Sequence, residues 1–129
     1  APVIAESEIV AIQVTGSIHA PYASANCASC HDRRNSNRLI LDGTDLCTKC
    51  HTGILTGKKV VHLVAAIDCL FCHNAHRSPA PRLLSKSLID VCLDCHAESK
   101  VMKDHGQIID CSACHNPHES DSPSLLQFR

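Results

Sequence analysis

The sequence contains almost none of the large aromatic residues that usually dominate a hydrophobic core. Its 129 residues include no Trp, one Tyr and two Phe. Because such side chains bury the largest apolar areas in a small domain, this polypeptide has little from which to build an interior of its own. A single domain of this length therefore needs apolar bulk from another source.

Long apolar runs and clusters of basic residues are also lacking. No segment approaches the ~20 apolar residues of a membrane-spanning helix, so no such helix is expected. Lys and Arg total 12 against 13 Asp and Glu, without a basic run or an aromatic platform, which excludes nucleic acid as an expected partner. The first residues do not form a secretion signal, so if the protein is exported we expect the signal to have been removed.

Cysteine and histidine are, by contrast, abundant and regularly placed. All ten cysteines lie in five copies of Cys-x-x-Cys-His, which we number motifs one to five. They are CASCH at 27–31, CTKCH at 47–51, CLFCH at 69–73, CLDCH at 92–96 and CSACH at 111–115. This signature is typical of c-type haem attachment, in which the two thiols bond to the haem and the histidine ligates the iron. We therefore predict five covalently attached haems c, held by Cys27, Cys30, Cys47, Cys50, Cys69, Cys72, Cys92, Cys95, Cys111 and Cys114.

Paired cysteines also occur in zinc ribbons and in disulfide scaffolds. Neither use explains a histidine directly after every second cysteine. A zinc-binding or disulfide-stabilised interaction module is therefore a minor alternative. It would be recognised by the lack of a Soret absorption band in the purified protein.

Five porphyrins would supply the apolar bulk that the polypeptide lacks. The motifs begin 19 to 23 residues apart, which leaves room for a helical turn or two and a loop. We predict a compact haem-centred fold that is mostly irregular, with short α-helices and little β-structure. Because its folding free energy would come from bound groups, the chain without haem is expected to be unfolded.

The chain divides into an N-terminal arm and a repeating domain. Residues 1–18 carry no haem motif, and the β-branched residues within 9–15 could form a strand. We expect a loosely docked arm, and the alternative is an arm that pairs with a neighbouring subunit. Residues 19–129 are predicted to form the pentahaem domain. Its three units are residues 19–51, 62–96 and 105–129.

Repeated sequence segments support this division and resemble a known family. CHNAHRSPAPRLL at 72–84 closely matches CHNPHESDSPSLL at 114–126. Together with the motifs, this resembles the multihaem c-type cytochromes with doubled CxxCH motifs, a group related to the class III cytochromes c. Some members of the wider group polymerise as extracellular filaments, or nanowires. The resemblance implies haem attachment outside the cytoplasm, and so an extracellular or cell-surface location, with the periplasm as the alternative.

The histidines match the number of ligands that five irons require. The motif histidines, predicted as proximal ligands, are His31, His51, His73, His96 and His115. The five other histidines are His19, His62, His76, His105 and His118. The five further histidines equal the five axial positions that remain, and they occupy repeated places in the units. We therefore predict that two histidines ligate the iron of every haem. Met102, the only methionine, is expected to fill an apolar gap.

Distance along the chain suggests how these ligands are paired. Seven, six and five residues separate His19, His62 and His105 from motifs one, three and five, so each histidine is assigned to the motif that follows it. The class III resemblance implies the same use of an upstream histidine. His76 follows motif three and is assigned to motif four, whose haem is on Cys92 and Cys95.

One motif and one histidine then remain unmatched. In the first unit the place that corresponds to His76 holds Arg34, which cannot ligate the haem on Cys47 and Cys50. His118 has the same place in the third unit, where no second motif follows. We therefore expect His118 to ligate haem two, either by folding back within the chain or in a neighbouring copy. The second version is a head-to-tail contact, which produces a homopolymer if it does not close into a ring.

The predicted function is electron transfer by such a polymer outside the cell, with a redox protein or an extracellular acceptor as partner. A soluble periplasmic shuttle is the alternative. Haem with two imidazole ligands has no open position for a substrate, so the chain is not expected to be an enzyme. A multihaem reductase is the least favoured reading, and a high-spin haem signal would support it.

Overall fold

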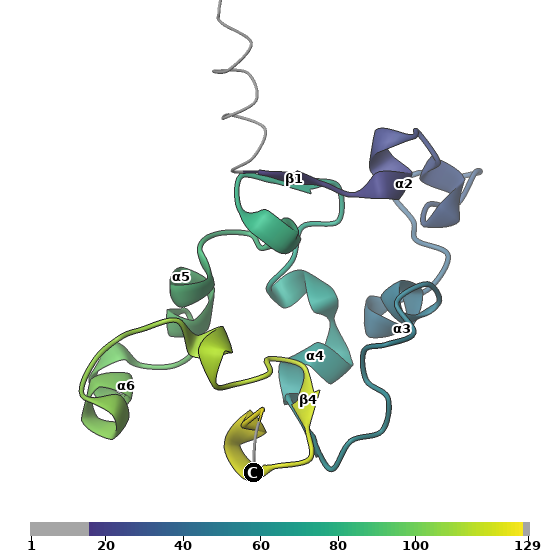
Figure 1. Ribbon diagram of the computed structural model, residues 1–129. Coiled ribbons are helices and arrows are strands. Elements are labelled where there is room, and N and C mark those ends of the chain that lie inside the picture. Colours follow the sequence, from purple (N-terminus) through teal and green to yellow (C-terminus); the bar gives the residue numbers. More distant parts are fainter. Residues whose placement is uncertain (1–15, 128–129) are drawn as a thin grey trace, which may run out of the picture.

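The computed structural model describes residues 16–127, and the strand expected within 9–15 lies outside them. The secondary structure is short and scattered between turns and loops (Figure 1). The α-helices of this part are α2 (Ala20–Ala23), α3 (Gly43–Thr48), α4 (Leu63–Ile67), α5 (Leu88–Leu93) and α6 (Glu98–His105). None of them combines the length and the apolar character needed to cross a membrane. The predicted fold, mostly irregular with short helices and little β-structure, is confirmed.

All five CxxCH motifs share one backbone turn. The N–H of the motif histidine donates to the carbonyl of the first cysteine, at 2.9 to 3.0 Å. In motifs one, three and five this turn begins with a 3-10 helix, η1 (Cys27–Ser29), η2 (Cys69–Phe71) and η4 (Cys111–Ala113), whereas in motifs two and four it begins within α3 and α5. One helical turn places residues three and four apart on the same face, so both cysteines and the histidine of each motif share a side.

Two small sheets connect successive units. Strand β1 (Ser17–Ile18) pairs antiparallel with β3 (Arg77–Ser78), and β2 (Val60–Val61) pairs antiparallel with β4 (Glu119–Ser120). Strand β1 precedes motif one and its partner β3 follows motif three, in the next unit. In the same way β2 precedes motif three and its partner β4 follows motif five. The units are therefore interleaved, and Figure 1 shows β1 running beside a segment from the middle of the chain.

Helices α3 and α4 approach each other closely. Gly43 begins α3 with φ at +56°, and a Cβ atom there would lie 2.5 Å from the carbonyl oxygen of Ile67. The hydroxyl of the buried Thr44 donates to the carbonyl of Ala65 at 2.7 Å. Because motif two lies partly in α3 and motif three follows α4, this contact brings the two motifs together.

The described residues form almost no core. Ala80 is their only buried apolar side chain, whereas Leu63 is 70% exposed and Phe71 63% exposed. Large apolar side chains exposed in such number mark surfaces that cover a ligand or a partner. Two further 3-10 helices, η3 (Pro81–Leu83) and η5 (Pro123–Leu125), follow β3 and β4 respectively.

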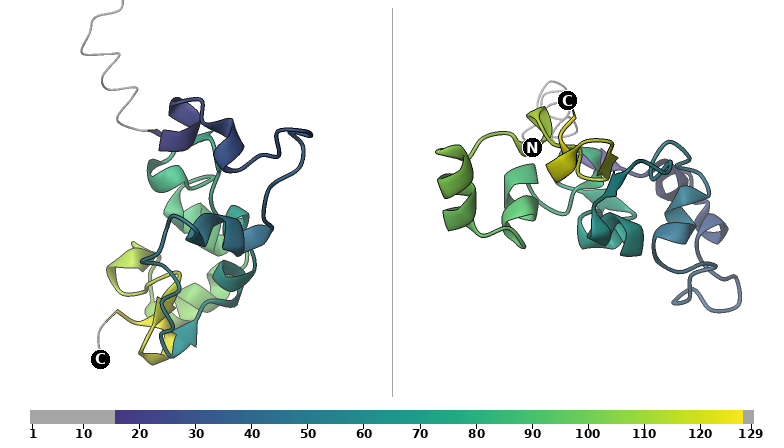
Figure 2. Two further views of the ribbon diagram at one scale, coloured as in Figure 1. Left: turned by 90° about the vertical axis from the view of Figure 1, so that its right-hand side faces the viewer. Right: turned by 90° about the horizontal axis from the view of Figure 1, so that it is seen from below.

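The helices are spread across the molecule. Figures 1 and 2 both place α5 and α6 at one end and α2 and α3 at the other, with α4 between them. After α6 the chain turns back, and β4 lies beside α4 in the middle of the molecule, where it pairs with β2 (Figure 1).

Candidate haem-binding sites

The ten histidines of the sequence form five pairs. Each pair joins a motif histidine with one from outside the motifs, and we number sites one to five by their motif. The ring centroids lie 6.0 Å apart in the pairs His31–His76 and His51–His19, and 6.2 Å apart in His73–His118, His96–His62 and His115–His105.

This separation fits two imidazoles that ligate one iron from opposite sides. An imidazole nitrogen binds a transition metal at about 2 Å and lies about 1 Å from the centre of its ring, so two ligands facing each other across a metal have centroids roughly 6 Å apart. Parallel rings in direct contact lie closer, as the rings of Tyr22 and His76 do at 4.5 Å. The pairs therefore fit haem iron.

Backbone carbonyls fix the outer nitrogen of several of these rings. Nδ1 of His19 lies 2.8 Å from the carbonyl oxygen of Ala75, and Nδ1 of His62 lies 2.8 Å from that of Pro117. The same contact, at 2.6 to 3.1 Å, joins His31 to Ser36, His73 to Arg82, His105 to Val101 and His115 to Ser124. A carbonyl only accepts, so Nδ1 carries the proton and Nε2 keeps its lone pair for a metal. Metal-ligating histidines are typically held in this way.

The cysteines form no disulfides and are accessible for bonding to haem. All ten are free, and each is exposed or partly exposed. Within residues 16–127, no three His, Cys, Asp or Glu side chains gather as a zinc site requires. The zinc and disulfide alternatives therefore gain no support from this part of the chain.

Two of the three upstream histidines do not serve the motif that follows them. His19 faces His51 of site two, and His62 faces His96 of site four. The predicted assignments of His19 to the haem on Cys27/Cys30 and of His62 to that on Cys69/Cys72 are therefore wrong. The physical reason is the strand pairing, because these histidines directly follow β1 and β2 and are bound through N–H and Nδ1 to the next unit.

His105 behaves differently, since it ends helix α6 and follows no strand. Its ring faces His115 of site five, as predicted. Its Nδ1 is held within its own helix, 3.1 Å from the carbonyl of Val101. Site five is therefore completed within the third unit.

The downstream histidines serve the preceding unit. His76 faces His31 of site one, and His118 faces His73 of site three. The predicted assignments of His76 to haem four and of His118 to haem two are therefore wrong. Antiparallel pairing carries β3 and β4 back alongside β1 and β2, and their histidines move with them. Arg34 occupies the matching place in the first unit.

This pairing removes the argument for a link between chains through His118. His51 already has His19, and His118 already has His73. All ten histidines lie in the described residues, and each is paired within one chain. The predicted head-to-tail contact, His118 to haem two of a neighbour, therefore gains no support from this structure.

Burial favours the uncharged form of several site residues. Desolvation, together with the nearby His73, lowers the pKa of the half-buried His118 and so favours the neutral imidazole that can ligate a metal. Desolvation and a hydrogen bond with Cys69 raise the pKa of the Cys47 thiol to about 11. Desolvation and the neighbouring Cys111 raise that of Cys92 to about 11.

Contacts between the cysteines of different motifs show which sites are neighbours. Cys47 with Cys69 joins site two to site three, and Cys92 with Cys111 joins site four to site five. Backbone bonds join the remaining neighbours. The N–H of His19 in site two donates to the carbonyl of His76 in site one at 2.8 Å, and the N–H of His62 in site four donates to His118 in site three at 2.9 Å.

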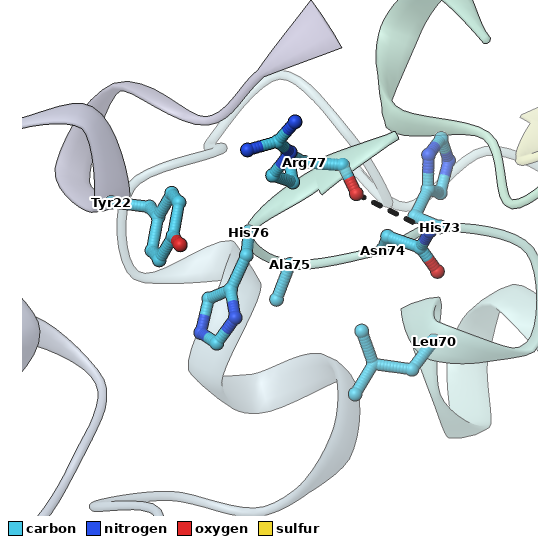
Figure 3. Close-up of a pocket in the computed structure, with 7 residues that line it drawn as sticks. All are labelled: Tyr22, Leu70, His73, Asn74, Ala75, His76 and Arg77. Carbon is cyan, nitrogen blue, oxygen red and sulfur yellow. Dashed lines mark hydrogen bonds between the residues drawn. The ribbon is translucent and has the colours of Figure 1, made fainter. Parts of the chain in front are cut away.

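Sequence reasoning gave no role to Tyr22, which lies beside site one. Its ring stacks on that of His76, with 18° between the ring planes (Figure 3). The two rings line a pocket of about 540 Å³ that also includes Leu70. The only available signal was that the single tyrosine of the chain stands three residues after a ligand histidine.

Comparison with known proteins agrees with this geometry. The family described as "Doubled CXXCH motif" matches residues 19–54, 62–101 and 105–129. The chain is also similar to the multiheme cytochrome MtrA of Shewanella baltica (strain OS185), with 34% identity over 90 residues. The match covers 64% of this chain and 27% of that relative, so this chain spans only about a quarter of the relative's length.

Proposed function

From the premise that the chain belongs to the doubled CXXCH motif family and is a multihaem c-type cytochrome with covalently bound haem c, we propose that it transfers electrons through five haems, each ligated by two histidines. The observation that carries this proposal is the set of five histidine pairs at 6.0 to 6.2 Å. Each bound haem supplies an iron that alternates between the ferric and ferrous states.

The residues of the chain would hold and tune these groups. The two cysteines of each motif would form the thioether bonds, and the paired histidines would ligate the iron. Carbonyls bound to Nδ1, such as that of Ala75 on His19, strengthen electron donation by the ring. Two imidazole ligands favour low reduction potentials. Exposed apolar side chains beside motif three, such as Leu63 and Phe71, would cover porphyrin surface.

The route would follow the chain order from site one to site five. Contacts between neighbouring motifs alternate between thiol pairs, such as Cys47 with Cys69, and backbone bonds, such as that from His19 to His76. Short separations of this kind support electron transfer in steps between neighbours. Entry at one end and exit at the other would make the molecule a conduit.

We propose a carrier rather than an enzyme. Substrate reduction at a haem needs an open axial position. The pairing of every histidine supports two ligands at each site. A high-spin ferric signal in the resting protein would contradict this and favour a reductase.

The proposed location is outside the cytoplasm, where haem is attached to CxxCH motifs in the proteins that this chain resembles. A redox protein, or an acceptor outside the cell, would take its electrons. Because one chain provides two histidines for each of its five sites, we propose that a single copy ligates all of its haems without a second copy. A filament, the first expectation from the sequence, would need a junction that does not use His118.

Native mass spectrometry with electron paramagnetic resonance tests this proposal. We expect the 13.9 kDa polypeptide to carry five haems as a monomer, with low-spin bis-histidine signals alone. Fewer haems or a high-spin signal would contradict the five-site scheme. A polymeric native particle would contradict the single-copy proposal and leave electron transfer intact.

A further inference from the structure

Two consecutive residues with left-handed backbone conformation follow motif three, and two more follow motif five. Arg82 and Leu83 have φ values of 58° and 57°, and Ser124 and Leu125 have φ values of 57° and 58°. This conformation is unfavourable for every residue except glycine, and two such residues in succession are unusual. It persists where the surrounding structure imposes it, which is characteristic of functional sites.

In unit two, both carbonyls of the left-handed pair point at the motif histidine and its neighbour. The carbonyl of Arg82 accepts from Nδ1 of His73 at 2.9 Å. The carbonyl of Leu83 accepts from the N–H of Asn74 at 2.7 Å. Unit three repeats both bonds, Ser124 with His115 at 2.7 Å and Leu125 with Asn116 at 2.8 Å.

A buried serine anchors each of these loops. The Ser78 hydroxyl donates to the carbonyl of Leu84 and accepts from the N–H of Ala80 at 3.0 Å. Ser120 makes the equivalent bonds to Leu126 and Ser122. The loop is therefore fixed on both sides of the left-handed pair.

Unit two has an additional support from the first unit. The Ser17 hydroxyl of β1 accepts from the N–H of Leu83 at 2.8 Å and donates to the carbonyl of Ala80 at 2.7 Å. The corresponding strand residue beside unit three is Val60, whose side chain cannot hydrogen-bond. The two loops thus share one backbone and differ in one support.

The first unit shows that a left-handed pair is not needed simply to make such a bond. Nδ1 of His31 lies 2.6 Å from the carbonyl of Ser36, which is not among the described residues with positive φ. The unfavourable conformation at sites three and five therefore calls for a reason specific to those sites.

We propose that the left-handed pairs are positioning elements that set the reduction potential of sites three and five. By holding a carbonyl on Nδ1 of His73 or His115, each pair fixes the tautomer and orientation of the ring and strengthens its donation from Nε2. Stronger donation stabilises the ferric state, so the carbonyl lowers the reduction potential of its own site. This inference rests on the proposed function, because it requires haem at both sites.

Ser124 offers the sharpest test, because its substitution changes no charge. Ser124→Gly retains the left-handed backbone readily, whereas Ser124→Val strongly disfavours it. We expect the potential of site five to rise in the Val variant and to stay unchanged in the Gly variant. Haem methyl resonances followed by NMR through a reductive titration report each site separately, so sites one to four serve as internal controls.

Arg82 provides an independent repeat at site three. Arg82→Val is expected to raise the potential of that site alone, and Arg82→Lys, which keeps charge and backbone, should not. Ser124→Gly should also melt at a slightly higher temperature, because the strain of the left-handed conformation is relieved while the potential is unchanged.

An unchanged site-five potential in Ser124→Val, or an equal rise in the Gly variant, would overturn the proposal. If Ser124→Val fails to assemble haem, Ser120→Ala removes the hydroxyl that anchors the loop and should raise the same potential by a smaller amount. An unchanged potential there would overturn it as well. Failure of the proposed function would instead be visible in the unsubstituted protein, as missing haem or a high-spin signal.

Discussion

His76 lies three residues after His73 in the chain, yet its ring faces His31 in the unit before. The N–H of His19 binds the carbonyl of His76, so the position of His76 is set by strand pairing and not by its own motif. The register of the paired strands therefore determines which histidine completes a site.

Substitution of His76 tests this register directly. His76→Ala should remove one axial ligand from site one and leave site four, to which sequence order had assigned it, unchanged. We expect one high-spin signal in place of one low-spin signal, with haem methyl shifts confined to site one. The matched variant His118→Ala should produce the same change at site three. A change at site four after His76→Ala would contradict the pairing.

Tyr22 is expected to restrain the His76 ring. An aromatic stack of this kind contributes about 1 kcal/mol, and Tyr22→Ala would free the ring to rotate about its bond to the iron. We predict an altered g-anisotropy at site one, because it depends on the relative orientation of the two imidazole planes. Tyr22→Phe keeps the stacked ring and is the control. Equal spectra for the Ala and Phe variants would show that the stack has no such role.

At the scale of elements, strands of only two residues determine which unit supplies each ligand. The short helices, the five motifs and the matching count of histidines could be predicted because each is a local or compositional property. The pairing of β1 with β3 could not, since a strand such as Ser17–Ile18 has no periodicity to detect. Proximity along the chain was the only guide available, and it failed for His19, His62 and His76.

Glu119 in β4 holds the loop that leads to β2. It is only 3% exposed, and its carboxylate accepts from the N–H of Thr56 at 2.8 and 2.9 Å and from that of Lys58 at 3.2 Å. These bonds keep its pKa below the ordinary value, those of Thr56 contributing most. The carboxylate therefore stabilises the junction between units two and three.

Neutralising this carboxylate should weaken the junction. Glu119→Gln is expected to lower the melting temperature by a few degrees, whereas Asp121→Asn, which neutralises a carboxylate that accepts one exposed bond from the N–H of Lys59, should have little effect. Because the pKa is lowered in the folded state, the contribution is present above the ordinary pKa of a glutamate and disappears as the pH falls through the lowered one. Thermal melts across the acidic range should therefore converge for the wild type and Glu119→Gln. A constant difference between them at every pH would contradict this account.

At the scale of the whole molecule, interleaving makes the units depend on one another. Site one takes His76 from unit two, and site three takes His118 from unit three. Sites two, four and five each draw both histidines from a single unit. Damage to the middle of the chain should therefore reach more sites than damage to site five.

The folded state should also depend on the haems themselves. Ala80 is the only buried apolar residue between 16 and 127, and large apolar side chains such as Leu63 and Phe71 are mostly exposed on the polypeptide alone. Hydrophobic burial is the main favourable term in folding, so a chain without it cannot offset its conformational entropy. We predict that the polypeptide produced without haem attachment is unfolded, with poorly dispersed amide NMR signals and no cooperative thermal transition. The control is the haem-loaded protein, which should melt cooperatively. A cooperative transition in the haem-free chain would mean that the polypeptide has a source of stability other than its bound groups.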